Sequence, residues 1–213
     1  MKYLYIDTSS AYLYTGIVEE DKLLIEKKKY LEHELSKESL YIVSEMFEEA
    51  NLSVDDIDKI IVVNGPGSFT GIRIGLTFAK VYAWAKKIEV TSISSLDAMA
   101  ISTNISTNKV PMLNARRGYV YTGIYSKDNE LLFDNSYIKL DEFMNSLNKL
   151  DDYKIISNDE EIELDKIEYN PNILEIVSYY KNKESINPHE LNPNYLKKTA
   201  AEEAKDDNRD NEE

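Results

Sequence analysis

KIIVVNGPGSFTGIRIGLTFAKVYAWAKK, residues 59–87, predicts a buried strand, a tight turn and a long helix. The β-branched run at 60–63 is typical of a strand that is buried on both faces. Gly65 and Gly67 suit positive φ angles or a close approach of the backbone, and the proline between them fixes one φ. From Ile72 the apolar residues no longer alternate, which favours a helix up to the end of the stretch. We therefore expect an α/β fold organised around this turn.

The same turn invites comparison with nucleotide-binding loops. A phosphate-binding loop places Lys and Ser/Thr directly after its last glycine, whereas Gly71 is followed by Ile72 and Arg73. The dinucleotide fingerprint also fails, because its third glycine comes one residue late, after Thr70. A helix N-terminus can still hold an anion, so two interpretations stay open: a plain strand-to-helix turn capped by Ser68 or Thr70, and a vestigial anion site. The candidate anion-site residues are Asp7, Gly65, Gly67 and Gly71.

Composition limits the classes of function. The chain has 213 residues, enough for one large or two small domains, with 42% hydrophobic and 30% charged residues. No apolar run approaches the length of a membrane span and the N-terminus lacks a signal-peptide pattern, so we expect a cytoplasmic protein without a membrane partner. The absence of cysteine excludes disulfides, thiol nucleophiles and thiolate metal sites. A net charge of −14 argues against direct binding of nucleic acid.

Two predicted helices have more apolar surface than one core contact needs. The helix at 33–51 carries two apolar stripes, and the helix after Gly71 has a stripe of small residues, Gly75, Ala79 and Ala83, beside a larger apolar one. A helix that is apolar on two sides is buried on two sides, either inside its own domain or against a partner. We expect one stripe of each helix to cover a sheet and the others to meet a partner. The candidate partner-binding residues are Leu35, Leu40, Ile42, Val43, Met46, Phe47, Ile74, Phe78, Val81 and Tyr82.

The order of predicted elements repeats along the chain. Three strands at 2–7, 11–18 and 23–29 form an antiparallel meander, followed by helix, strand, helix, strand and a serine-capped helix that starts near Ser94. After a polar stretch the second half predicts strand, strand, strand, helix, strand, helix, with Asp141 capping its first helix. The predicted domains are an N-terminal domain at 1–101 with the partner-binding helices, a C-terminal domain at 102–200 and an acidic disordered tail at 201–213.

Several segments resemble the bacterial TsaB (YeaZ) family, and together they span nearly the whole chain. They are GPGSFTGIRIGL at 65–76, YIDTSS at 5–10, HELS at 33–36, SSLDA at 94–98 and PNYLK at 193–197. The resemblance implies the actin/Hsp70/sugar-kinase-like (ASKHA) fold, with two similar β-β-β-α-β-α subdomains. One segment departs from the family, because NARRGYVY at 114–121 stands where the family has Asp-Ala-Arg-x-Gly-Glu-Val-Tyr. Asn114 and Tyr119 therefore lack the family's acids.

The resemblance also implies a division of labour in the synthesis of threonylcarbamoyladenosine on tRNA. It implies a non-catalytic scaffold subunit, without cofactor or metal ligands, that pairs with a catalytic TsaD-like paralogue through the helices of its N-terminal half. A small TsaE-like ATPase joins that pair, and tRNA is met only through the complex. In isolation we expect a homodimer, which would hide the same apolar helices from water.

An enzyme of the same fold, an ATP-dependent kinase or a peptidase-like hydrolase, is the alternative. The superfamily carries an acidic residue near the nucleotide phosphates where Asp7 stands, and the turn at 65–71 is the other support. No Gly-x-Ser-x-Gly elbow for a serine nucleophile occurs. The two histidines, His33 and His189, lie too far apart in sequence for a metal-binding pair on one helical turn. Arg73, Arg116 and Arg117 are either anion ligands or structural arginines.

Overall fold

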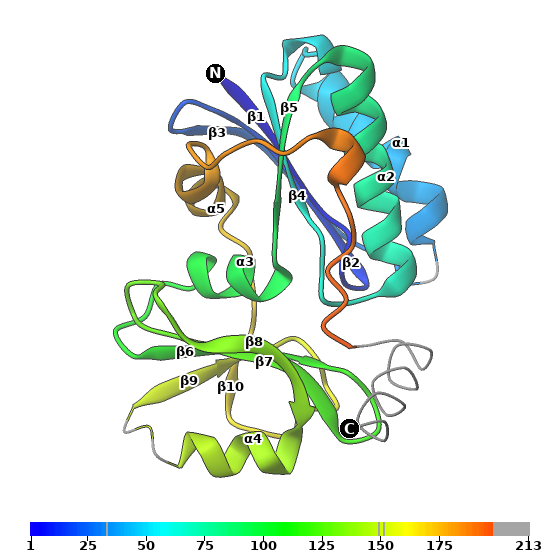
Figure 1. Cartoon of the computed structure of the whole chain (residues 1–213). Coiled ribbons are helices and arrows are strands. Elements are labelled where there is room, and N and C mark those ends of the chain that lie inside the picture. The colour runs from blue at the N-terminus through cyan, green and yellow to red at the C-terminus, as the bar shows by residue number, and fades with distance from the viewer. Residues whose placement is uncertain (33, 149, 151, 198–213) are drawn as a thin grey trace, which may run out of the picture.

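The computed structural model describes residues 1–32, 34–148, 150 and 152–197, and these form two five-stranded sheets (Figure 1). The strands of the first sheet are β1 (Lys2–Asp7), β2 (Tyr12–Glu19), β3 (Lys22–Tyr30), β4 (Lys59–Val63) and β5 (Glu89–Ile93). They lie in the order β3-β2-β1-β4-β5. The first three strands form the predicted antiparallel meander, and β4 and β5 run parallel to β1.

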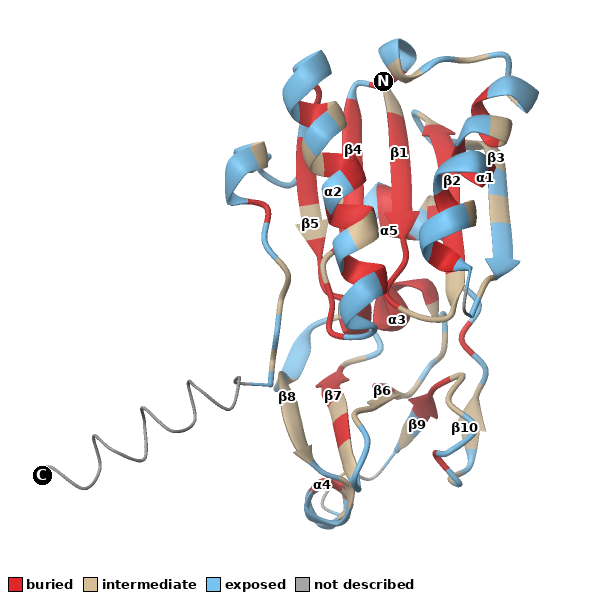
Figure 2. Cartoon of the chain, turned by 90° about the vertical axis from the view of Figure 1, so that its right-hand side faces the viewer, coloured by how far each residue is buried: buried red, intermediate tan, exposed pale blue. Residues whose placement is uncertain are grey.

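Helices cover both faces of this sheet (Figures 1 and 2). On one face lie α1 (Leu35–Glu49) and α2 (Phe69–Lys86), and on the other lie α3 (Ser95–Ser102) and α5 (Ile173–Tyr180). Because side chains alternate along a strand, β1 contributes Leu4 and Ile6 to the core beneath α1 and α2, and Tyr3 and Tyr5 to the core beneath α3 and α5. The predicted burial of residues 60–63 is confirmed, since every residue of β4 is buried.

A smaller second sheet repeats the same arrangement. Its strands are β6 (Asn108–Asn114), β7 (Tyr119–Tyr125), β8 (Leu131–Lys139), β9 (Tyr153–Ile156) and β10 (Lys166–Ile167), in the order β10-β9-β6-β7-β8. Helix α4 (Leu140–Leu147) packs on it through the buried side chains of Phe143 and Leu147. The predicted cap at Asp141 is wrong: the helix begins one residue earlier, and Lys139 occupies the cap position without a side-chain hydrogen bond.

The predicted α/β fold of the actin/Hsp70/sugar-kinase type is confirmed, with one difference in the second half. Helix α2 connects β4 to β5, whereas the acidic segment 157–165, without a helix, connects β9 to β10. The short strand β10 was not predicted, because two residues carry no periodic signal.

The C-terminal part of the chain returns to the first sheet. Helix α5 packs on that sheet, and Leu191, after the short helix η2 (Pro188–Glu190), is buried in the core that α2 covers. The domain boundary between residues 101 and 102 stays a prediction. His33 and the acidic tail at 201–213 lie outside the described residues.

The N-terminus of α2 is capped as predicted. Ser68 occupies the cap position, and its hydroxyl accepts a hydrogen bond from the backbone N–H of Gly71 at 3.2 Å. Within the described part of the chain, none of the helices combines the length and apolar character that a membrane crossing requires.

Candidate functional site

An apolar groove of about 830 Å³ runs between α1 and α2 on the outer face of the first sheet. It contains seven of the predicted partner-binding residues, drawn from both helices. These are Leu40, Val43 and Phe47 of α1 and Ile74, Phe78, Val81 and Tyr82 of α2. Leu40 and Val81 are each 53% exposed, so the groove leaves large aliphatic side chains in contact with solvent.

The other three predicted residues are not in the groove. Leu35, Ile42 and Met46 are buried, and Met46 belongs to the core between α1 and the sheet. Spacing alone could not separate the two stripes of α1, because both have helical periodicity. Partner binding by these three residues stays a prediction, and the groove contains the other seven.

Small residues bring α2 close to the first sheet. An added Cβ at Gly71 would lie 2.0 Å from the carbonyl oxygen of Thr8, and one at Gly75 would lie 2.5 Å from the Thr8 hydroxyl. That hydroxyl donates to the Gly71 carbonyl at 2.7 Å and accepts from the Gly75 N–H at 3.2 Å. Ala79 and Ala83 of the predicted small-residue stripe are also buried. This face of α2 therefore packs against the sheet, and Val81 and Tyr82, on another face of the helix, line the groove.

One end of the groove carries an exposed cluster of two aromatic rings and an arginine. The guanidinium carbon of Arg73 lies 3.7 Å from the centre of the Phe69 ring, and its Nε donates to the hydroxyl of Tyr195 at 3.1 Å. The rings of Phe69 and Tyr195 are stacked, with centres 5.4 Å apart. Arg73 therefore has a structural role here, tying the C-terminal segment to the first turn of α2.

The candidate anion site is packed against the turn that follows β1. Gly65 and Gly67 have φ angles of 108° and 151°, in the region that favours glycine, and an added Cβ at Gly67 would lie 2.2 Å from the Ser9 carbonyl. The Ser68 N–H donates to that carbonyl at 2.7 Å. The structure thus brings the two predicted turns together, but these backbone contacts are internal. Anion binding there stays a prediction.

Asp7 is buried at the base of the same turn. It is 3% exposed, and its Oδ1 accepts hydrogen bonds from the N–H and the hydroxyl of Ser9 at 2.8 and 2.7 Å. Burial raises the pKa of the Asp7 carboxyl, and the bonds from Ser9 oppose that shift. An acid in this setting holds its own turn in place.

The remaining candidates lie apart from the groove. Arg116 and Arg117 are exposed on the turn between β6 and β7, where both have left-handed φ angles, of 65° and 55°. Asn114, which stands where the family has an acid, accepts from the Arg116 N–H through its side chain at 2.8 Å and so stabilises that turn. The ring of His189 lies edge-on to that of Trp84, 6.5 Å between centres. Across the described residues no three His, Cys, Asp or Glu side chains are grouped to hold a metal ion.

A second cavity, about 780 Å³ in volume, lies between the two sheets and was not predicted from the sequence. Its walls come from the end of β1 and the turn after it, from β2, the end of β3, α3 and the end of β6, and from part of the segment 157–169. Two signals pointed toward it: tyrosines at alternate positions of β2, and the run of acids at 159–161. Neither signal says which distant segments meet, so the cavity could be identified only from the three-dimensional structure.

The relatives of this chain agree with the fold and with the resemblance of its segments. The family model described as "TsaD: tRNA N6-adenosine threonylcarbamoyltransferase" matches residues 30–186. The chain is 31% identical to the tRNA threonylcarbamoyladenosine biosynthesis protein TsaB of Bacillus subtilis, over 95% of this chain and 96% of that protein. It is 33% identical to TsaB of Escherichia coli, over 42% of this chain and 40% of that protein.

Two solved structures from Pseudomonas aeruginosa have the same fold. One is described as YeaZ, with a TM-score of 0.71, and the other as an uncharacterized protein with similarity to peptidase YEAZ, with a TM-score of 0.76. Each is 18% identical to this chain and covers 92% of it and 99% of the solved chain.

Proposed function

This chain belongs to the TsaB family, and we propose that it acts there as a non-catalytic scaffold subunit. Its relatives support a role in the biosynthesis of threonylcarbamoyladenosine in tRNA. The proposed partner is a catalytic TsaD-like paralogue, seated on the groove between α1 and α2. The groove carries this proposal, because it leaves Leu40, Val81 and the edges of neighbouring apolar side chains in water in the isolated chain.

The same groove supports a homodimer when the partner is absent. A two-fold pairing would place the same apolar surface of one copy against that of the other. In the working complex a TsaE-like ATPase would join the heterodimer. Contact with tRNA would come only through the assembled complex, since a chain with a net charge of −14 repels phosphate.

The contacts of the turn at 65–71 favour a scaffold over a kinase or hydrolase of the same fold. Gly67 and Gly71 serve the close approach to Ser9 and Thr8, and Asp7 is bonded to Ser9. The residues on which the enzyme alternative rests thus have packing roles that need no nucleotide.

Light scattering after size-exclusion chromatography tests the pairing, with the chain alone and mixed with the TsaD-like paralogue from the same cell. We expect a homodimer that converts to a one-to-one heterodimer. Mass spectrometry of tRNA nucleosides from cells depleted of the chain should show a loss of threonylcarbamoyladenosine. An unchanged elution in the mixture would refute the pairing, and saturable binding of ATP with magnesium in calorimetry would favour the enzyme instead.

A further inference from the structure

Four basic side chains and two tyrosines from separate segments lie together on the second sheet, outside the groove. The set, which we call the basic patch, consists of Arg116 and Arg117 of the turn before β7, Tyr119 of β7, Tyr137 and Lys139 of β8, and Lys197 of the C-terminal segment. Tyr119 lies directly opposite Lys139 in the pairing of β7 with β8. The C-terminal segment runs from η2 to β8 and brings Lys197 there (Figures 1 and 2). The sequence alone did not predict the patch, because its members are far apart in the chain.

The two tyrosine rings form an aromatic surface between the cations of the patch. Tyr119 and Tyr137 are stacked, with ring centres 4.6 Å apart and an angle of 9° between their planes. The ammonium of Lys139 lies 6.0 Å from the centre of the Tyr119 ring, and that of Lys197 lies 5.3 Å from the centre of the Tyr137 ring. Because Val120 belongs to the core beneath α4 and side chains alternate along a strand, the rings lie on the face of the sheet that α4 leaves uncovered.

The four cations of the patch have no acidic partner among the residues that the structure describes. Elsewhere, Lys27, Lys86 and Lys181 each place the ammonium 2.6 Å from a carboxylate oxygen. Single lysines without an ion pair, such as Lys22 and Lys127, also occur, whereas the patch gathers four cations on one surface. In a chain with 39 acids and 25 basic residues, this gathering reverses the charge locally and attracts an anionic partner.

The two arginines stand beside a cavity of about 420 Å³ at one end of the patch. Both line it, together with Tyr119 and one acid, Glu161. Their side chains are exposed, and the hydrogen bond from the Arg116 N–H to the Asn114 side chain, at 2.8 Å, stabilises their turn. A guanidinium binds phosphate oxygens through two parallel N–H groups. Two arginines on a fixed turn, beside a hollow in the surface, therefore suit a phosphate group.

We propose that the basic patch contacts the backbone of tRNA when this chain works in its complex. The inference rests on the proposed function, which brings tRNA to that complex. Phosphates would meet the arginine turn, Lys139 and Lys197, and a ribose or an unpaired base would lie on the tyrosine pair. Cations interleaved with aromatic rings are typical of surfaces that bind single-stranded or looped RNA. The groove lining contains none of the six residues, so the patch stays open when a partner is seated on the groove.

Fluorescence anisotropy with a labelled, unmodified tRNA transcript measures the contact, on the complex of the full chain with the TsaD-like paralogue. The double change Arg116→Gln with Arg117→Gln should raise Kd about fivefold to 25-fold, since one exposed ion pair is worth up to about fivefold. The slope of log Kd against log salt concentration should fall by about 1.4–1.8, because two phosphate contacts are lost. Tyr119→Leu should weaken tRNA binding without changing that slope, because it removes a stacking surface and no charge.

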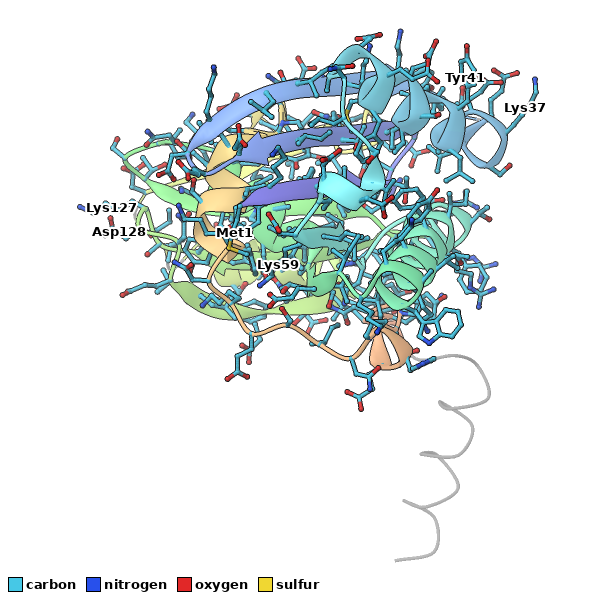
Figure 3. All side chains as sticks on the ribbon, turned by 90° about the horizontal axis from the view of Figure 1, so that it is seen from above. Met1, Lys37, Tyr41, Lys59, Lys127 and Asp128 are labelled. Carbon is cyan, nitrogen blue, oxygen red and sulfur yellow. The ribbon has the colours of Figure 1, made fainter. Side chains whose placement is uncertain are left out.

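A double change with the same loss of charge, Lys22→Gln with Lys127→Gln, provides the control. Both lysines are exposed and lie outside the patch: Lys22 begins β3 of the first sheet, and Lys127 follows the other end of β7, on the side opposite α1 in Figure 3. Because exposed charges at a distance are screened by salt, this control should bind tRNA within about twofold of the original complex.

Light scattering of each variant mixed with the paralogue keeps pairing and tRNA binding apart. The inference is wrong if the arginine change leaves tRNA binding intact, if the lysine control weakens tRNA binding as much, or if the arginine change breaks pairing, which would make the patch a protein contact. An original chain that does not pair at all would overturn the proposed function and this inference with it, whereas pairing without an effect of the arginines on tRNA would overturn this inference alone.

Discussion

Leu40→Asp should strongly weaken pairing at the groove while the free chain stays folded. Leu40 lies in the groove on α1 and is 53% exposed, so about half of its surface remains to be covered by a partner. Full burial of a leucine side chain is worth about 1.5–3 kcal/mol, which leaves roughly 1 kcal/mol for the interface. Aspartate would lose this contribution from burial. It would also bring a charge into an apolar contact, at a cost of several kcal/mol unless the carboxylate stays hydrated.

The expected loss is therefore about 2–4 kcal/mol of binding free energy, or roughly 30-fold to 1,000-fold in Kd. The free energy of unfolding of the free chain should change by less than about 1 kcal/mol, because Leu40 is exposed and the change costs little beyond helix propensity. Calorimetry with the TsaD-like paralogue measures the first quantity. Thermal unfolding followed by circular dichroism measures the second.

The neighbouring residue provides the control. Tyr41 is 60% exposed, lies on the same helix outside the groove, and points outward from α1 on the side away from α2 (Figure 3). Tyr41→Asp adds the same charge at almost the same distance from the helix N-terminus, so it should leave Kd within about threefold of the original. Equal losses from Leu40→Asp and Tyr41→Asp, or full binding by Leu40→Asp, would refute the groove as the interface.

Three further changes test the interior. Gly71→Ala should destabilise the chain by about 3 kcal/mol or more in urea denaturation, because the new Cβ would lie 2.0 Å from the backbone oxygen of Thr8. Asp7→Asn should gain stability relative to the original as pH rises above 3.8, since burial raises the pKa of Asp7 and the ionised form then weakens the folded state. Asp97→Ala should cost about 2–4 kcal/mol, because it removes the acceptor that Tyr125, Tyr180 and Asn135 share, although Tyr125 and Asn135 each keep a second bond.

Each of these changes has its own check. Gly118 has nothing within 4 Å of an added Cβ, so Gly118→Ala reports strain from its φ of 76° alone and should cost only about 1 kcal/mol. A stability difference between Asp7→Asn and the original that stays flat from pH 4 to pH 7 would contradict the burial argument. Tyr180→Phe removes one of the bonds to Asp97 and should cost about 1 kcal/mol. An equal cost from Asp97→Ala would mean that the network acts as a single bond.

Periodicity predicted the helices better than it predicted their faces. The hydrophobic pattern of α1 and α2 predicted two apolar sides for each helix. In the structure one apolar side packs against the sheet and the other lines the groove. The pattern could not say that Met46 faces the sheet while Leu40 faces outward, because both positions recur with the helical repeat. That choice depends on the direction in which the helix lies across the sheet, which is a tertiary property.

The sequence did not predict the cavity between the sheets, and the reason is related. Its residues come from strand ends and connections that are far apart in the chain, such as Tyr12 and Tyr169. Sequence patterns report contacts along one element, whereas a cavity between two sheets depends on how separate elements meet. The missing helix between β9 and β10 matters here, because the acidic segment in its place supplies Asp159, Glu160 and Glu161 to the lining.

The turn at 65–71 has the glycines of a phosphate-binding turn, but here these glycines serve the packing of the chain on itself. In a phosphate-binding turn, glycines bring free N–H groups close to a ligand. Here Gly67 and Gly71 bring the chain close to Ser9 and Thr8, whose oxygens fill that space. The same approach fixes α2 against β1, and a fixed α2 holds Val81 and Tyr82 along the groove. Glycine at these positions is thus explained by the close packing of α2 on the turn after β1, without a ligand, which agrees with the proposed role of a subunit that works through a partner.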